Sequence, residues 1–184
     1  MSMESLKKLI GFVVGFAVVS GGIYLVRGGD RLKKFEPYHS DQGQFSVLFP
    51  GKPTKKLQLL RTPAGEIDLW MFSAGSKKSV FVVGYADYPQ RLINNSDPTR
   101  MLDGARDGAV RNVRGSLVDE TEIDFYGYPA RELEIEVPQK GTVGARLILI
   151  DNRLYQVMVV SQSARILDRK GSEFLDSFSV DGIE

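Results

Sequence analysis

The 184-residue sequence contains no cysteine and a single histidine, His39. The missing cysteines exclude disulfides, thiolate nucleophiles, cysteine-bound zinc or iron–sulfur centres, and lipid attachment through a thiol. One histidine excludes multi-histidine metal sites and leaves general acid–base catalysis without its commonest residue. His39 itself precedes the predicted domain, so we expect an exposed side chain in a linker, with a pH-responsive contact or a lone ligand as the alternative.

Motifs for phosphate binding and nucleophilic catalysis are absent as well. The 19 glycines form no Gly-x-Gly-x-x-Gly after a predicted strand, and Gly-Lys-Ser/Thr does not occur. No Gly-x-Ser-x-Gly nucleophile elbow is present, and no pattern marks a glycosidase-like carboxylate pair. We therefore predict no catalytic residues, no cofactor, no metal centre and no enzymatic activity.

Charge is distributed unevenly along the chain. Residues 1–34 contain six basic and two acidic residues, a net charge of +4, whereas the remainder carries 18 basic and 21 acidic residues, a net charge of −3. A weakly acidic domain is a poor ligand for nucleic acid, which we do not expect as a partner. The basic collar is better explained by contact with lipid headgroups; its members are Lys7, Lys8, Arg27, Arg31, Lys33 and Lys34.

One uncharged segment, residues 9–26, is long enough to span a bilayer. As a helix it would measure about 27 Å, close to the hydrocarbon thickness. A cleaved signal peptide is the alternative, since Ser20-Gly21-Gly22 resembles a cleavage site, but apolar residues continue through it to Val26. We favour an uncleaved, single-pass anchor in the inner membrane, with the following domain on the periplasmic or extracytoplasmic side.

Three glycines of this segment, Gly11, Gly15 and Gly22, share one helix face. Small residues there allow a second membrane helix to approach closely. Alternatively, they reflect only the general abundance of glycine in membrane helices. The sequence leaves both readings open.

The chain divides into a short tail (1–8), the transmembrane helix (9–26), a basic linker (27–40) and one α+β domain (41–184). Alternating or continuous apolar runs predict strands at 45–49, 57–61, 66–73, 79–85, 117–125, 130–137, 143–150 and 154–161. The run SVFVVGY is nearly all apolar and indicates a central strand covered on both faces.

Two helices are predicted within this domain. Asp97 and Pro98 predict the start of the first, a stripe of small and apolar residues from Met101 to Val113 gives it a buried face, and Gly115 fits its C′ position. An amphipathic segment over 163–178 predicts the second, with a break at Gly171. Together the elements predict an antiparallel sheet covered by helices.

Candidate binding residues are few. Glu132, Glu134 and Glu136 alternate on one strand face and could form a cation site or a docking stripe for a basic partner. The alternative is that basic residues of neighbouring strands, Arg146 for instance, neutralise them. Trp70, Phe72 and Tyr85 could line a pocket, although strand spacing favours core packing.

Several phrases resemble the PsbP-like family: FSVLFPGKP, GYPARELEIEVP, ARLILIDNRLYQVMVV and FLDSF. The resemblance covers roughly residues 36–181 and contains no catalytic motif. It implies an α/β/α sandwich around an antiparallel sheet, a fold usually found on the outer face of a membrane. This chain would be a bacterial, membrane-anchored member of the family. The best-understood protein of that fold is an extrinsic accessory subunit of photosystem II.

The sequence thus predicts a non-catalytic, membrane-anchored accessory or scaffolding subunit. Its expected partners are membrane lipid and a larger integral membrane protein complex, photosynthetic or otherwise energy-transducing. The alternative is an exported module, tethered to the membrane, that binds a small ligand or a cation.

Overall fold

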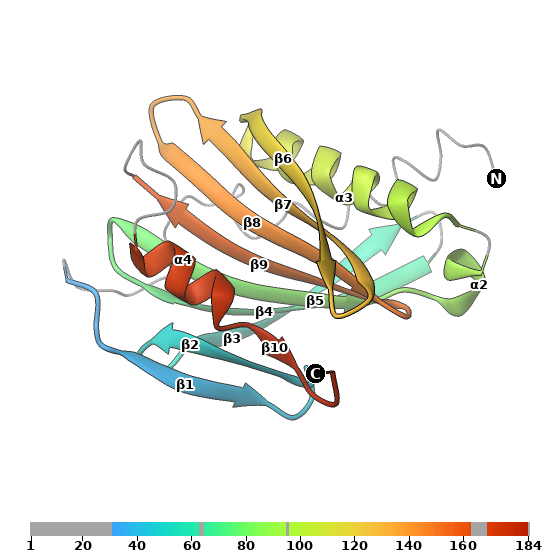
Figure 1. Cartoon of the computed structure of the whole chain (residues 1–184), viewed down its shortest axis with the longest axis horizontal. Helices are drawn as coiled ribbons and strands as arrows, with labels where there is room; N and C mark the ends of the chain where they lie inside the picture. The colour runs from blue at the N-terminus through green and yellow to red at the C-terminus, as the bar shows by residue number, and fades with distance from the viewer. Residues whose placement is uncertain (1–30, 63–64, 95, 163–168, 184) are drawn as a thin grey trace.

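The computed structural model describes residues 31–62, 65–94, 96–162 and 169–183. The predicted anchor at 9–26 lies outside these residues. Within them, no helix combines the length and the apolar character needed to cross a bilayer. The described residues form two antiparallel sheets and three helices in layers (Figure 1).

The larger sheet has seven strands in the order β3-β4-β5-β9-β8-β7-β6, and the smaller sheet has the order β1-β2-β10. The strands are β1 (Phe35–Ser40), β2 (Phe45–Pro50), β3 (Thr54–Thr62), β4 (Gly65–Gly75), β5 (Ser79–Asp87), β6 (Ser116–Phe125), β7 (Tyr128–Val137), β8 (Gly141–Ile150), β9 (Arg153–Ser161) and β10 (Ser179–Val180). The helices are α2 (Gln90–Ile93), α3 (Pro98–Val113) and α4 (Arg169–Asp176).

The centre of the large sheet is buried on both faces, as the apolar runs predict. Strand β5 pairs with β4 on one side and β9 on the other, and its residues from Val80 to Ala86 are all buried. Strand β9 shows the same continuous burial, and in β8 only Arg146 interrupts it after the first residue. A sheet that is apolar on both faces needs a covering layer on each, and the rest of the fold supplies these layers.

Helix α3 covers one face of the large sheet. Asp97 caps its first turn by accepting a hydrogen bond from the Thr99 amide at 2.9 Å, and Pro98 occupies the first helical position. The predicted stripe is buried against Leu133, Ile135, Ala145 and Leu147 of the sheet. Glycine and alanine on this stripe keep side chains short, so the helix axis lies close to the strands.

The opposite face is covered by the small sheet and α4 together. Between the layers lies a cluster of aromatic rings in which Phe45 contacts Phe72, Tyr38 contacts Phe49, and Phe174 contacts both Phe49 and Phe81, with centroid distances of 5.2–5.8 Å. Sequence patterns predicted helices alone as the cover. They missed β1, because Phe35 and Tyr38 are the only large apolar residues in a stretch that reads as a polar connector; pairing with β2 makes it a strand.

Two local predictions were wrong. Gly171 does not break the last helix; it is buried in the first turn of α4. At the end of α3, the left-handed position belongs to Arg114 (φ 53°), and Gly115 follows it. Glycine is needed at 115 for space, because a Cβ atom there would lie 2.5 Å from the Glu136 carbonyl oxygen.

Replacing Gly115 with alanine tests this close approach. We expect Gly115→Ala to lower the free energy of unfolding by about 1–3 kcal/mol, as overpacking against backbone does. Gly84→Ala is the matched control, since a Cβ atom there has its nearest neighbour at 3.6 Å. We expect that control to leave stability unchanged within about 0.5 kcal/mol or to raise it. Equal urea midpoints for Gly115→Ala and the parent chain would contradict the packing argument.

Candidate functional site

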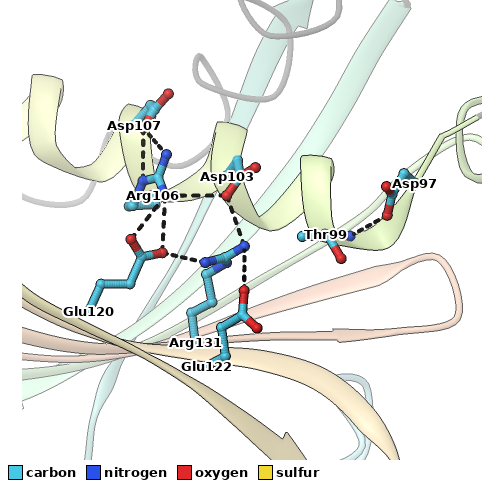
Figure 2. Close-up of polar contacts among 8 residues, drawn as sticks. All are labelled: Asp97, Thr99, Asp103, Arg106, Asp107, Glu120, Glu122 and Arg131. Atoms are coloured by element: carbon cyan, nitrogen blue, oxygen red, sulfur yellow. Dashed lines mark hydrogen bonds and ion pairs between the residues drawn. The ribbon is translucent and has the colours of Figure 1, made fainter.

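The largest polar cluster lies between α3 and the strands β6 and β7 (Figure 2). Arg131 on β7 is only 7% exposed and contacts Asp103 of α3 at 2.8 Å and Glu120 of β6 at 2.6 Å. Arg106 of α3 contacts the same Asp103 and Glu120, and also Asp107. Two arginines therefore share two carboxylates that lie on different elements.

Ion pairs among its own members hold this cluster together. Burial lowers the pKa of Arg106, but the hydrogen bonds that it donates to Asp107 and Glu120 outweigh burial and raise the pKa overall. Each carboxylate already accepts from a guanidinium, while the buried Nε of Arg131 has no hydrogen-bond partner among the described residues. The cluster joins the helix to the sheet, and a structural role accounts for all of its contacts.

His39 forms a second cluster with a superficial likeness to a hydrolytic triad. Its Nδ1 lies 3.1 Å from Ser46 Oγ, and its Nε2 lies 3.1 Å from a carboxylate oxygen of Asp41. Asp181 is 3.7 Å from the same nitrogen. The Asp41 side chain is fully exposed and that of His39 is 47% exposed, so solvent screens the pair and the imidazole is not held rigidly. A catalytic triad requires a buried acid to orient the imidazole, and this arrangement lacks one.

A polar cavity of about 420 Å³ opens at the end of the fold where β8 turns into β9. Its wall includes Arg153, whose guanidinium forms a bidentate pair with Asp87 at 2.6 and 2.8 Å. The same guanidinium donates to the Gly43 carbonyl at 3.2 Å and lies 4.7 Å above the Tyr85 ring. Its hydrogen bond with Asp87 raises the pKa of Arg153. The cation is therefore already occupied by protein groups.

Two tyrosines near this cavity are held neutral. Burial raises the pKa of Tyr85 to about 12, with Arg153 opposing that effect, and burial alone raises the pKa of Tyr88. Both hydroxyls are buried and, among the described residues, neither has a hydrogen-bond partner. A phenol with so high a pKa is a poor general base at neutral pH. Neither tyrosine therefore supplies this cavity with an activated hydroxyl.

The three glutamates of β7 differ in whether a neighbouring basic residue neutralises them. Arg146 of β8 contacts Glu132 at 2.6 Å and also Asp176 of α4 at 2.6 Å, so a neighbouring strand neutralises the first glutamate. Glu134 and Glu136 face Gly144 and Thr142 across the same strand pair. Across residues 31–62, 65–94, 96–162 and 169–183, no three acidic or histidine side chains lie where they could hold a metal ion.

Other predicted site residues are placed in part. Gly11, Gly15 and Gly22 and the basic residues Lys7, Lys8 and Arg27 lie outside the described residues. Arg31, Lys33 and Lys34 are exposed just before β1. Of the aromatic trio, Phe72 and Tyr85 are buried in the core and Trp70 is half-buried.

An exposed apolar edge is the feature that the sequence patterns missed. Strand β3 is the last strand of the large sheet and, in the part of the chain that the structure describes, pairs with β4 alone. Leu57 and Leu59 on this strand are 45% and 51% exposed. Leu57 lies opposite Trp70, over which Lys55 places its ammonium group at 4.2 Å. Alternation in LQL indicates a half-buried strand, and only the topology shows that its outer side remains uncovered.

We call Leu57, Leu59, Trp70 and Lys55 the β3 edge patch. The opposite edge differs, because β6 carries Asp119, Glu120 and Glu122 and a bulge between Leu117 and Asp119. Charges and bulges protect sheet edges from pairing with other chains. The β3 edge has an uncharged stretch, Leu57–Leu60, and no bulge. It is therefore the edge better suited to accept another strand or an apolar surface.

Comparison with a solved structure supports the fold. No protein-family model and no curated protein matches the chain. The solution structure of cyanobacterial PsbP (CyanoP) from Synechocystis sp. PCC 6803 is similar, with a TM-score of 0.55 and 15% identity, covering 83% of this chain and 96% of that one. PA94, a Pseudomonas aeruginosa protein of unknown function, matches at a TM-score of 0.33 and 13% identity, over 69% and 82% of the two chains.

The domain therefore has a PsbP-like α+β fold with antiparallel sheets and few helices. At 15% identity the similarity concerns the fold alone.

Loss of Arg131 should weaken the junction between α3 and the sheet. We expect Arg131→Ala to lower the free energy of unfolding by roughly 2–4 kcal/mol, because buried carboxylate contacts lose their cation. The contribution of Glu122 is small, since its side chain is 75% exposed. Arg111→Ala, on the exposed side of α3, is the control and should change stability by less than about 0.5 kcal/mol. Urea unfolding followed by circular dichroism measures both; equal effects would refute the assignment.

Alkaline pH should destabilise the fold through Tyr85 and Tyr88. Because folding raises both pKa values above the ordinary value of 10.0, the folded state keeps protons that the unfolded chain releases. Stability is fully present below about pH 10 and falls as pH rises toward 12, by on the order of 2 kcal/mol. Tyr85→Phe/Tyr88→Phe should flatten this dependence and cost little at pH 7, since neither hydroxyl has a partner. Tyr126→Phe, at a position 60% exposed, should leave the dependence unchanged.

Proposed function

We propose that this protein is a non-catalytic accessory subunit that docks on a larger membrane protein complex and stabilises it. The observation that carries the proposal is the β3 edge patch on a PsbP-like fold. Half-exposed leucines beside a half-buried tryptophan form the kind of apolar surface that soluble domains keep for a partner. Tryptophan at the centre of such a patch is also a common anchor of interfaces.

The patch and the strand edge would act together. An extended segment of the partner adds to β3 through backbone hydrogen bonds, and its apolar side chains cover Leu57 and Leu59. Lys55 is held in place by a hydrogen bond to Gln42 at 2.7 Å as well as by the Trp70 ring. A positioned cation at the patch border favours a partner segment that carries an acidic residue there.

Membrane anchoring completes the proposal. The apolar segment 9–26 would insert in the inner membrane, with the domain on the periplasmic or extracytoplasmic side. Gly11, Gly15 and Gly22 would let a helix of the partner complex approach closely. A tether of this kind raises the effective concentration of the domain near its partner, so a modest edge patch can suffice for stable docking.

A module that binds a small ligand is the competing proposal. The cavity beside Arg153 is the observation in its favour. Its support is weaker, because the guanidinium is already paired with Asp87 and stacked on Tyr85. A thermal-shift screen of ions and metabolites addresses this proposal, since a ligand at 100 times its Kd adds about 2.7 kcal/mol to stability.

Introducing carboxylates into the β3 edge patch by substitution should release the partner. We expect Leu57→Glu/Leu59→Glu to reduce co-purification of the membrane complex from mild detergent by at least ten-fold, because a carboxylate in an apolar contact loses its hydration. The double variant should fold normally, since both side chains are half-exposed. Leu117→Glu/Val118→Glu on the opposite edge is the matched control and should retain the complex.

Blue native electrophoresis of the solubilised membrane distinguishes the outcomes. The parent chain and the β6-edge control should migrate with a stoichiometric larger complex. Migration of the parent chain as a lone monomer would contradict an accessory role. If the β3-edge variant retains the complex, the β3 edge patch is not the docking surface.

A further inference from the structure

Charged side chains are segregated between the two ends of the large sheet. One end contains the start of β1 and the turns β2–β3, β4–β5 and β7–β8, as the strand registers show. This is the left-hand end in Figure 1. Basic side chains are exposed at each of these places and at the start of α4: Arg31, Lys33, Lys34, Lys52, Lys77, Lys78, Lys140, Arg169 and Lys170. We call this set the basic end.

Contacts between distant segments bring these residues together. The aliphatic stem of Lys33 packs at Gly51, where its Cδ lies 2.9 Å from the position of an added Cβ atom. The ring of Phe35 contacts that of Phe81 at 5.2 Å, which places the start of β1 beside the β4–β5 hairpin. The Gln162 amide, at the end of β9, donates to the Lys78 carbonyl at 2.9 Å. The basic end is therefore one surface of the folded domain.

The opposite end of the strands is acidic. Exposed aspartates lie in the β1–β2 and β8–β9 turns, at the ends of β5 and β6, at the cap of α3 and after β10: Asp41, Asp151, Asp87, Asp124, Asp97 and Asp181. At the basic end, the exposed acidic side chains are Glu36, Glu136 and Glu173, each within a strand or helix. The domain thus has a charge dipole along its strands, even though the net charge of the chain is close to zero.

The length of the linker limits how far the basic end can lie from a membrane. Seven residue steps separate Val26, the last residue of the proposed anchor, from Lys33 on the domain. Fully extended, they span at most about 25 Å. With the proposed anchor, Lys33 at the basic end therefore lies within about 25 Å of the bilayer. An anionic surface attracts lysine and arginine within about a screening length, near 8 Å at physiological ionic strength.

We infer that the basic end binds the anionic headgroups of the membrane in which the chain is anchored, so that the strands stand away from the bilayer. This inference rests on the proposed anchor and extends the headgroup contact from the linker to the folded domain. In that orientation the β3 edge runs away from the membrane and faces sideways, toward a neighbouring protein in the same bilayer. Binding at the basic end would thus present the docking patch.

Site-specific quenching in vesicles tests the inference with the full chain. The sequence has no cysteine, so single cysteines can carry a fluorophore at exposed neutral positions, Gln162 at the basic end and Ser179 near the acidic end. The vesicles contain phosphatidylcholine alone or with one third phosphatidylglycerol, plus a headgroup-attached nitroxide lipid. We expect quenching at 162 to be at least two-fold greater in the anionic vesicles and to fall in high salt, with no change at 179.

Matched charge variants separate this surface from net charge. Lys78→Gln/Lys140→Gln removes two cations from the basic end and should abolish the difference between vesicles. Arg91→Gln/Arg100→Gln removes two exposed cations from α2 and the start of α3, at the other end of the sheet, and should preserve the difference. Equal loss of the difference in both variants, or equal quenching at 162 in both kinds of vesicle, overturns the inference. An acidic protein surface would then be the better candidate partner of the basic end.

Flotation of the same samples separates failure of the anchor from failure of the inference. A chain that floats with phosphatidylcholine vesicles alone is anchored independently of charge. If it floats but shows no dependence on anionic lipid, the inference fails and the anchor stands. If it floats only with anionic vesicles, the basic end binds lipid and the anchor fails.

Discussion

The fold depends on one constraint: the central strands of the large sheet are apolar on both faces, and each face must be covered. On the face of Val82 and Met158 the cover is α3, with Leu92 of the short helix α2 beside it. On the face of Val83 and Val157 it is the small sheet with α4, joined through the aromatic cluster. Because β1 and β2 precede the large sheet in the chain and α4 and β10 follow it, this second layer brings both ends of the domain together.

That second layer also determines how the surface is used. Pairing of β1 with β2 places the chain's entry point beside the β4–β5 hairpin, and so gathers the basic residues at one end. The small sheet covers Phe72 but leaves Leu57 and Leu59 half-exposed. An incompletely covered edge on a well-packed sheet is costly to maintain unless another molecule uses it, since exposed edges promote aggregation.

Much of this architecture follows from local patterns. A continuous apolar run identified β5 as central, and Asp97-Pro98 with the small-residue stripe identified α3, because these signals depend on neighbours in sequence. The small sheet could not be inferred in this way. Strand β1 has a polar sequence and is stabilised by pairing with β2, and β10 contributes only Ser179 and Val180. The β3 edge patch was equally hidden, because exposure of Leu57 and Leu59 depends on strand order, which no local pattern encodes.

Clusters of charge illustrate the difference between a feature that looks functional and one that is free to act. Arg131, Arg153 and Arg146 each lie in a concentration of polar groups, and each is bound by carboxylates of the same domain. Such arginines fix one element against another, and a ligand would have to displace an existing partner. The lysines of the basic end lie in turns and at the ends of elements, and their side chains are exposed. Paired arginines inside hold the elements of the fold together. Exposed lysines at one end are suited to a diffuse, anionic surface, because a point charge on a flexible stem adapts to it better than a rigid guanidinium fork does.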